Sequence, residues 1–114
     1  MITYQIEKTV SVEEFREVLV NSTLGERRPI NNHETLSKML EHGNLIFTAR
    51  DNGKLIGIAR LLTDFNYCTY LSDLAVDENY QKMGIGKELI KQTKLKTPNA
   101  KLILLSAPKA VEYY

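Results

Sequence analysis

Two glycines two residues apart, Gly84 and Gly86, follow an apolar strand-like run and open a helical pattern. Glycine lets the backbone turn successive N–H groups toward one point, where the start of a helix adds partial positive charge. Lys82 and Lys87 flank the glycines and can add charge-assisted contacts to an anion. The segment Gln81–Lys87 therefore predicts a loop that holds a pyrophosphate.

Two better-known phosphate motifs do not fit this loop. A Walker loop needs Ser or Thr after Gly-Lys, but Glu88 follows Lys87, and the dinucleotide fingerprint needs a third glycine where this chain has Leu89. A lone Gly-x-Gly is also compatible with a plain turn at the start of a helix. The glycines alone are therefore compatible either with a nucleotide site or with a plain turn at the start of a helix.

The elements before this loop are predicted from periodicity and capping. Alternation over residues 2–6 predicts a strand, and Ser11 with Glu14 forms a capping-box pair before a first helix. Asn31 and Glu34 repeat that pattern before a second helix, and Gly43 is placed to end it in a left-handed turn. Residues 45–50, 55–63 and 68–76 read as strands.

The order of the remaining elements sets the fold class. Asp51-Asn52-Gly53 predicts a tight hairpin, and residues 83–95 have the apolar stripe of a helix. The apolar run in Lys101–Ser106 predicts a strand buried on both faces and parallel to strand 68–76, and Pro108 suits the start of another helix. We predict an α+β fold, α/β in looser usage, with a mixed, mostly antiparallel sheet flanked by helices.

Composition limits the class of protein. A chain of 114 residues with 43% hydrophobic residues suits one domain, residues 1–114. Fifteen basic against 14 acidic residues give a net charge of +1, so no nucleic-acid partner is expected. No long apolar run or signal-peptide pattern is present, so we expect a cytoplasmic protein without a membrane partner. The single Cys68 indicates neither a disulfide nor a metal site, and no metal cofactor is expected.

The segment from Asp73 to Ile90 resembles the central motif of the GCN5-related N-acetyltransferase (GNAT) superfamily. That motif is an apolar strand, a short acidic turn and Gln/Arg-x-x-Gly-x-Gly/Ala at the start of a helix. The resemblance implies the acyl-CoA N-acyltransferase fold and acetyl-CoA as co-substrate, with the pyrophosphate on the loop and the pantetheine arm on the backbone of the preceding strand. The cofactor-binding residues it implies are Leu74, Ala75, Val76, Gln81, Lys82, Met83, Gly84, Ile85, Gly86 and Lys87.

The resemblance also implies catalytic residues for direct attack of an amine on the thioester. Members of this superfamily often protonate the departing thiolate with a tyrosine, and Tyr113-Tyr114 matches the start of that pattern, which makes Tyr114 the candidate acid. Asp73 is the candidate base, because a strand disfavours Asp without a specific reason. Asp64 is better explained as a turn cap, and the two histidines as exposed residues.

The resemblance implies a final strand pair that a chain of 114 residues would lack. Two functions remain open: an N-acetyltransferase for a primary amine of a small molecule or peptide, or a non-catalytic acetyl-CoA-binding or interaction module. The edge at Lys101–Ser106 would be unpaired, so a homodimer is a further expectation. Arg27 and Arg28 give a weak hint of an acidic acceptor, but they read more readily as a solvated loop.

Overall fold

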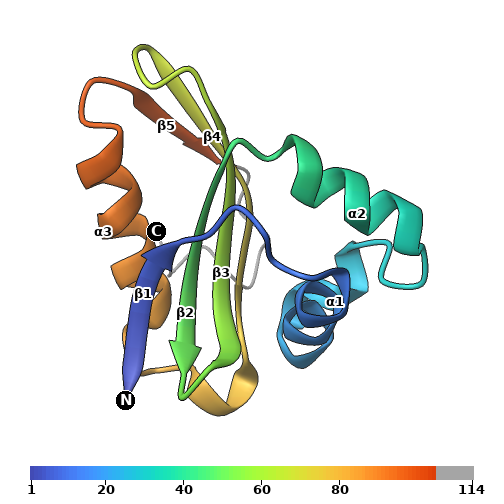
Figure 1. Ribbon diagram of the computed structural model, residues 1–114. Coiled ribbons are helices and arrows are strands. Elements are labelled where there is room, and N and C mark those ends of the chain that lie inside the picture. Colours follow the sequence, from blue (N-terminus) through green and yellow to red (C-terminus); the bar gives the residue numbers. More distant parts are fainter. Residues whose placement is uncertain (105–114) are drawn as a thin grey trace.

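A five-stranded sheet forms the middle layer of the protein (Figure 1). It is seen in a computed structural model that describes residues 1–104, apart from the side chains of Thr23 and Glu26. Neighbouring strands pair antiparallel except the last two, which are parallel, so the predicted mixed, mostly antiparallel sheet is confirmed. In spatial order the strands are β1 Ile2–Ile6, β2 Leu45–Asp51, β3 Lys54–Thr63, β4 Cys68–Val76 and β5 Lys101–Leu104.

Helices cover both faces of the sheet. Helices α1 (Val12–Asn21) and α2 (His33–His42) lie on one face, and α3 (Ile85–Lys96) lies on the other (Figure 1). Two short 3-10 turns, η1 (Thr23–Arg27) and η2 (Glu78–Tyr80), complete the described elements. The predicted order of elements is confirmed through residue 104, and the helix expected from Pro108 lies outside the described residues.

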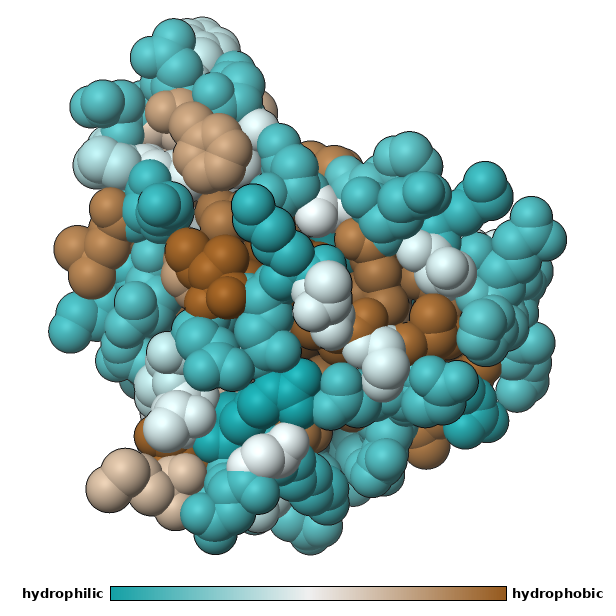
Figure 2. All heavy atoms as spheres, viewed as in Figure 1, coloured by the Kyte–Doolittle hydropathy of each residue, from teal (hydrophilic) through white to brown (hydrophobic). Residues whose placement is uncertain are grey.

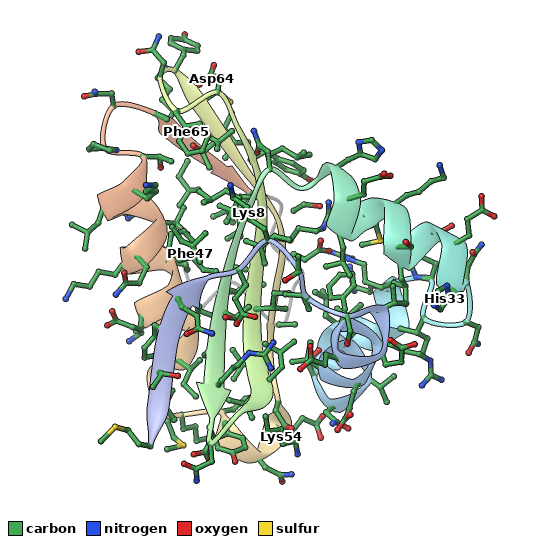
Figure 3. The ribbon with its side chains drawn as sticks, viewed as in Figure 1. Lys8, His33, Phe47, Lys54, Asp64 and Phe65 are labelled. Atoms are coloured by element: carbon green, nitrogen blue, oxygen red, sulfur yellow. The ribbon has the colours of Figure 1, made fainter. Side chains whose placement is uncertain are left out.

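Each face of the sheet has its own apolar core. On the α3 side, Phe47 from β2 packs with Ile85 and Leu89 of the helix, and Figure 3 shows Phe47 between the sheet and α3. On the other side, Phe15 and Leu36 bring α1 and α2 onto the sheet. Figure 2 shows hydrophilic side chains over most of the visible surface, with apolar atoms mainly over α3 and between the sheet and helices α1 and α2.

The two predicted helix starts differ in accuracy. The Ser11–Glu14 capping box is present, with the Glu14 amide donating to Ser11 Oγ at 3.1 Å. The second cap is Asn32, which accepts from the Thr35 amide at 3.0 Å, so the prediction of Asn31 was wrong by one residue. Two adjacent asparagines give the same capping signal, and only the backbone decides which of them lies at the cap.

The prediction that Gly43 ends α2 in a left-handed turn is wrong. Its φ of −77° is an ordinary value for any residue. Glycine is needed there for space, because a Cβ would lie 2.7 Å from Cγ of Arg60. The hairpin prediction is confirmed, since Asn52 and Gly53 have φ values of 51° and 92°.

Strand β5 departs from its prediction as a strand buried on both faces. Leu102 and Leu104 pack against the α3-side core, but Ile103 on the opposite face is 47% exposed. Helices α1 and α2 pack over the middle of the sheet, and within residues 1–104 no element covers this face of β5 (Figure 1). Homodimer formation at this edge stays a prediction. Over the same residues, no helix is long and apolar enough to cross a membrane.

Candidate active site

The predicted phosphate loop has the backbone geometry that an anion site needs. Lys82 and Gly84 have positive φ values of 71° and 78°, and Gly84 is the N-cap of α3. A Cβ on Gly84 would have no atom within 4 Å, so the space beside the glycine is open. The loop therefore turns through two left-handed residues directly before the first N–H groups of α3.

Helix α3 also differs from the other described helical segments in how it begins. Side chains cap the rest: Ser11 caps α1, Ser22 caps η1, Asn32 caps α2 and Asp77 caps η2. No side chain caps α3. The first N–H groups of a helix have no partner within the helix, so those of α3 remain available to an external anion.

Contacts with the ends of β4 and β2, and one hydrogen bond within the connection itself, hold the loop in place. The side-chain amide of Gln81 donates to the Val76 carbonyl at 3.3 Å, and the Tyr80 hydroxyl donates to Asp51 Oδ2 at 2.7 Å. That hydrogen bond lowers the pKa of Asp51 and raises the pKa of Tyr80. Asp77 accepts from the backbone amide of Asn79 at 2.8 Å. The sequence gives no sign of the Asp51–Tyr80 contact, because it joins residues 29 positions apart.

Lysines around the loop supply its positive charge. Lys82 and Lys87 are exposed on either side of Gly84, whereas Ile85 is buried in the α3-side core. Lys54, which the motif did not indicate, lies in the β2–β3 hairpin with its Nζ 4.0 Å from Asp77 (Figure 3). The other predicted loop residues are the exposed Met83 and the buried Gly86. A contact by Ile85 or Gly86 would therefore come from its main chain.

The end of β4 offers main-chain groups beside the loop. On one side, Leu74, Ala75 and Val76 pair with β3, and their side chains enter the two cores. On the other side, β5 pairs only with Cys68–Leu71 in the part of the chain that the structure describes. The backbone of residues 74–76 therefore has no strand partner there within residues 1–104, as expected if it binds an extended ligand.

Asp73 lies inside a buried ionic cluster. Its side chain has no exposed surface, one carboxylate oxygen accepts from Arg28 Nε, and the other accepts from Arg60 Nε. Arg60 also donates to Ser72 Oγ at 2.8 Å and to the Met39 carbonyl of α2 at 3.2 Å. The β3–β4 register shifts here, since Arg60 pairs with Asp73 but Leu61 pairs with Leu71, and Ser72 is the extra residue.

This geometry bears on the candidate catalytic residues. Both oxygens of Asp73 are engaged by guanidinium groups and none is exposed, which suits Asp73 to holding the arginines better than to taking a proton from an amine. Asp64 caps the β3–β4 turn as expected, accepting from the amides of Asn66, Tyr67 and Cys68, and these bonds lower its pKa. Tyr114 lies outside the described residues.

The remaining predictions from the sequence concern four residues expected to face solvent, and the prediction for Arg27 is confirmed because this residue is exposed. The expectation that His33 and His42 are exposed is confirmed, and Figure 3 shows His33 on α2, away from the sheet. The description of Arg28 as part of a solvated loop is wrong, because its side chain is only 23% exposed. It enters the Asp73 cluster from the segment that joins α1 to α2, and no local pattern indicates this long-range contact.

Comparison with known protein families identifies the family of this chain. The model of the acetyltransferase (GNAT) family matches residues 12–114, which includes the loop, β4 and the ionic cluster. The chain belongs to the GNAT family. The family expected from the loop motif is confirmed, and so is the expected fold class.

This GNAT chain is similar to several acetyltransferases. Over 63 residues it is 33% identical to the β-lysine N(6)-acetyltransferase of Methanococcus maripaludis, a match that covers 54% of this chain and 23% of that protein. A GNAT family acetyltransferase of Streptococcus pneumoniae has a TM-score of 0.80 at 27% identity, covering 100% of this chain and 83% of that one. For the ribosomal-protein-S18-alanine N-acetyltransferase of Escherichia coli the TM-score is 0.78 at 21% identity, with coverage of 99% and 72%.

Proposed function

We propose that this protein is an acetyl-CoA-dependent N-acetyltransferase that transfers the acetyl group directly from the thioester to a primary amine. The observation that carries the proposal is the start of α3, where two left-handed residues precede a helix with no side-chain cap. The proposed anion site follows β4 after the short η2 turn, and the end of β4 lacks a strand partner on one side within residues 1–104. Phosphates and an extended arm are the two parts of CoA that such neighbouring sites would bind.

Two segments of the chain would bind different parts of CoA. The main chain of Gln81–Lys87 would hold the pyrophosphate, with Lys82 and Lys87 adding charge-assisted contacts. The main chain of Leu74, Ala75 and Val76 would hydrogen-bond the pantetheine arm. The thioester would then lie toward the N-terminal end of this stretch, next to Ser72 and Asp73.

The acceptor amine must be neutral to attack the thioester carbonyl carbon. Its nitrogen forms the new bond to that carbon and loses one proton to solvent water, the carbon–sulfur bond breaks, and CoA leaves as a thiolate that gains a proton. Tyr114 is the proposed donor of that proton. The sequence suggested Asp73 as the base. Its contacts support a different role, in which Asp73 holds Arg28 in position.

The acceptor class is a small molecule or peptide with a primary amine. One relative is named for β-lysine and one structural neighbour for the alanine of a ribosomal protein, so amine acceptors of both sizes occur among similar proteins. We further propose a cytoplasmic location. The alternative is a non-catalytic acetyl-CoA-binding module, for which the same loop would serve.

The experiment that tests the cofactor site uses two glycines in the same backbone state. Gly84 and Gly53 both have left-handed φ values, and a Cβ added to either would have no atom within 4 Å. Alanine at either site should cost roughly 1–2 kcal/mol of backbone strain without a clash. Only Gly84→Ala places a methyl group in the proposed phosphate site, so only this variant should lose the thermal stabilisation by CoA.

Thermal unfolding with and without CoA measures this difference, with Gly53→Ala as the matched control. Equal CoA-induced shifts in the two variants would disprove the assignment of the loop. CoA binding without release of CoA in the presence of any amine would favour the non-catalytic module.

Tyr114→Phe tests the proposed acid separately. The hydroxyl matters only as charge develops on the departing sulfur, so kcat should fall about a hundredfold or more while CoA affinity stays the same. Steady-state rates of CoA release measure kcat, and thermal shifts measure CoA affinity. Unchanged turnover would exclude Tyr114 as the acid.

A further inference from the structure

We infer that Arg28 recognises a carboxylate group on the acceptor, so that the preferred acceptors are amines that also carry a free carboxylate, such as amino acids. This inference rests on the proposed function and adds the chemical class of the acceptor. It is carried by three features of the Asp73 cluster: its charge balance, the exposure of its members, and its place relative to the proposed thioester site.

The charge balance of the cluster leaves one positive charge in excess. Two guanidinium groups, from Arg28 and Arg60, share the single carboxylate of Asp73. Among the side chains that the structure describes, neither arginine has another acidic partner. Charged groups with little exposure are normally paired, so among the described side chains the cluster lacks an acidic partner for its second arginine.

The excess charge resides on Arg28 and not on Arg60. Arg60 is 9% exposed, and each of its nitrogens donates to a protein oxygen, on Asp73, Met39 and Ser72. Arg28 is 23% exposed, so part of its side chain reaches the surface. Without Arg28, the remaining Arg60–Asp73 pair would be balanced one to one.

Arg28 is oriented but still has donors to offer. Its bonds to Asp73, to the Arg27 carbonyl at 2.9 Å and to the Ser72 carbonyl at 2.9 Å use one N–H on each nitrogen. A guanidinium has five N–H groups, so each Nη atom retains one. Two such donors on one rigid plane match the two oxygens of a carboxylate.

The position of Arg28 places these donors next to the proposed reaction. The Ser72 carbonyl, which accepts from Arg28, belongs to the bulge directly before Leu74–Val76. The pantetheine arm is proposed to follow those three residues, so its thioester would end beside Ser72. An acceptor whose amine meets the thioester there would have its carboxylate within reach of Arg28.

A purely structural role for Arg28 makes a different prediction. In that case Arg28 only ties the α1–α2 connection to β4, and its loss would affect all acceptors alike. Arg16 is a suitable control, because its Nε donates to the Ile30 carbonyl at 3.0 Å and ties the same connection to α1. Arg16 contributes nothing to the cluster around Asp73.

The test measures kcat/KM for pairs of acceptors that differ only in one group: lysine against lysinamide, and β-alanine against β-alaninamide. In the wild type, the carboxylate member of an accepted pair should be preferred roughly tenfold to a hundredfold, as expected for charge-assisted hydrogen bonds. In Arg28→Gln this ratio should fall to about one, and Arg28→Lys should restore part of it. Arg16→Gln should keep the wild-type ratio.

The outcomes separate this inference from the proposed function. Turnover without a preference for the carboxylate member, or an equal loss for both members in Arg28→Gln, would overturn the role of Arg28 and leave acetyl transfer in place. A chain that binds CoA but turns over no member of the panel would overturn both. Thermal shifts with CoA are measured on each variant, so that loss of the fold or of the cofactor site is recognised as such.

Discussion

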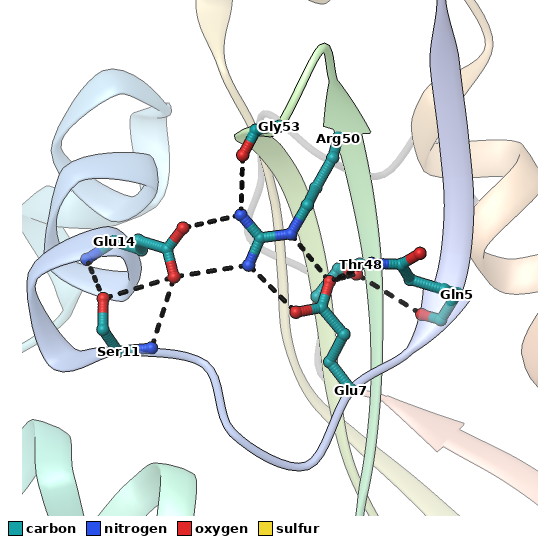
Figure 4. A network of polar contacts seen from close by, with 7 residues as sticks. All are labelled: Gln5, Glu7, Ser11, Glu14, Thr48, Arg50 and Gly53. Carbon is teal, nitrogen blue, oxygen red and sulfur yellow. Dashed lines mark hydrogen bonds and ion pairs between the residues drawn. The ribbon is translucent and has the colours of Figure 1, made fainter.

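Two ionic clusters hold elements of this protein together, one centred on an arginine and the other on an aspartate, and their charge balance is opposite. In the first, Arg50 of β2 binds two carboxylates, with its Nε 2.8 Å from Glu7 and its Nη1 2.6 Å from Glu14, so the cluster has one negative charge in excess (Figure 4). In the second, Asp73 binds two arginines, Arg28 and Arg60, and among the described side chains one positive charge is in excess.

The difference is explained by what each cluster joins. The Arg50 cluster joins the end of β1, the start of α1 and the β2–β3 hairpin, where the Gly53 carbonyl accepts from Nη1 at 2.9 Å. Its excess charge lies on Glu14, which is 37% exposed and solvated. The Asp73 cluster lies at the bulge of β4, beside the proposed thioester site. Water stabilises the excess negative charge of the first cluster, whereas the excess positive charge of the second is available to a ligand.

The largest loss of stability is expected when Arg50, the centre of the first cluster, is replaced. Arg50→Met keeps the stem of the side chain but leaves Glu7 and Glu14 facing each other without a cation. Removing one partner from a largely buried ion pair costs about 3 kcal/mol or more, and the exposure of Glu14 places this case at the lower end. Urea denaturation measures the loss. The CoA-induced thermal shift should stay, and its disappearance would mean that the two regions are coupled.

Acid should destabilise the protein mainly through the first cluster. The hydrogen bond from Arg50 is the main cause that lowers the pKa of Glu7 from 4.5 to about 2, and the same arginine lowers the pKa of Glu14. A carboxyl group with a lowered folded-state pKa contributes stability above its unfolded pKa and loses it as the pH falls. We therefore expect constant stability from pH 8 to 5 and a decline between about pH 4.5 and pH 2.

The acid prediction is measured by urea denaturation at a series of pH values, with Glu7→Gln as the reference. The contribution of Glu7 is at most about 3 kcal/mol, and solvent screening lowers it. Glu7→Gln should flatten the decline. An equally steep decline in that variant would assign the acid sensitivity to other groups.

Most of the fold could be predicted from the sequence because its signals are local. The alternation in β1, the capping box at Ser11 and the Asn52-Gly53 turn each depend on neighbouring residues, and each was found. The errors at Gly43 and Ile103 arose from tertiary packing. Gly43 makes room for Arg60, 17 residues further along the chain, and Ile103 is exposed because nothing described covers that face of β5.

In the candidate site, too, local features could be predicted from the sequence and long-range contacts could not. The proposed phosphate loop is a contiguous motif, so its residues were named from the sequence. The Arg28–Asp73 and Tyr80–Asp51 contacts join residues 45 and 29 positions apart, and no periodicity indicates them. Asp73 was singled out because Asp is unusual in a strand, and the structure supplies the reason in its two arginine partners.

The smallest effect on stability is expected when each cluster loses only its excess charge. Glu14→Gln keeps an oxygen that can accept from Arg50 and keeps the capping box, which tolerates Gln, while Arg50 remains paired with Glu7. Arg28→Gln likewise leaves the Arg60–Asp73 pair intact. Both changes should cost less than about 1 kcal/mol in urea denaturation, because a balanced pair survives in each cluster. Their effects on function should differ: only Arg28→Gln should remove the preference for carboxylate-bearing acceptors, since only that excess charge faces the proposed reaction site. A loss of several kcal/mol in Arg28→Gln would instead show that Asp73 needs both arginines, and the two clusters would then share a structural role.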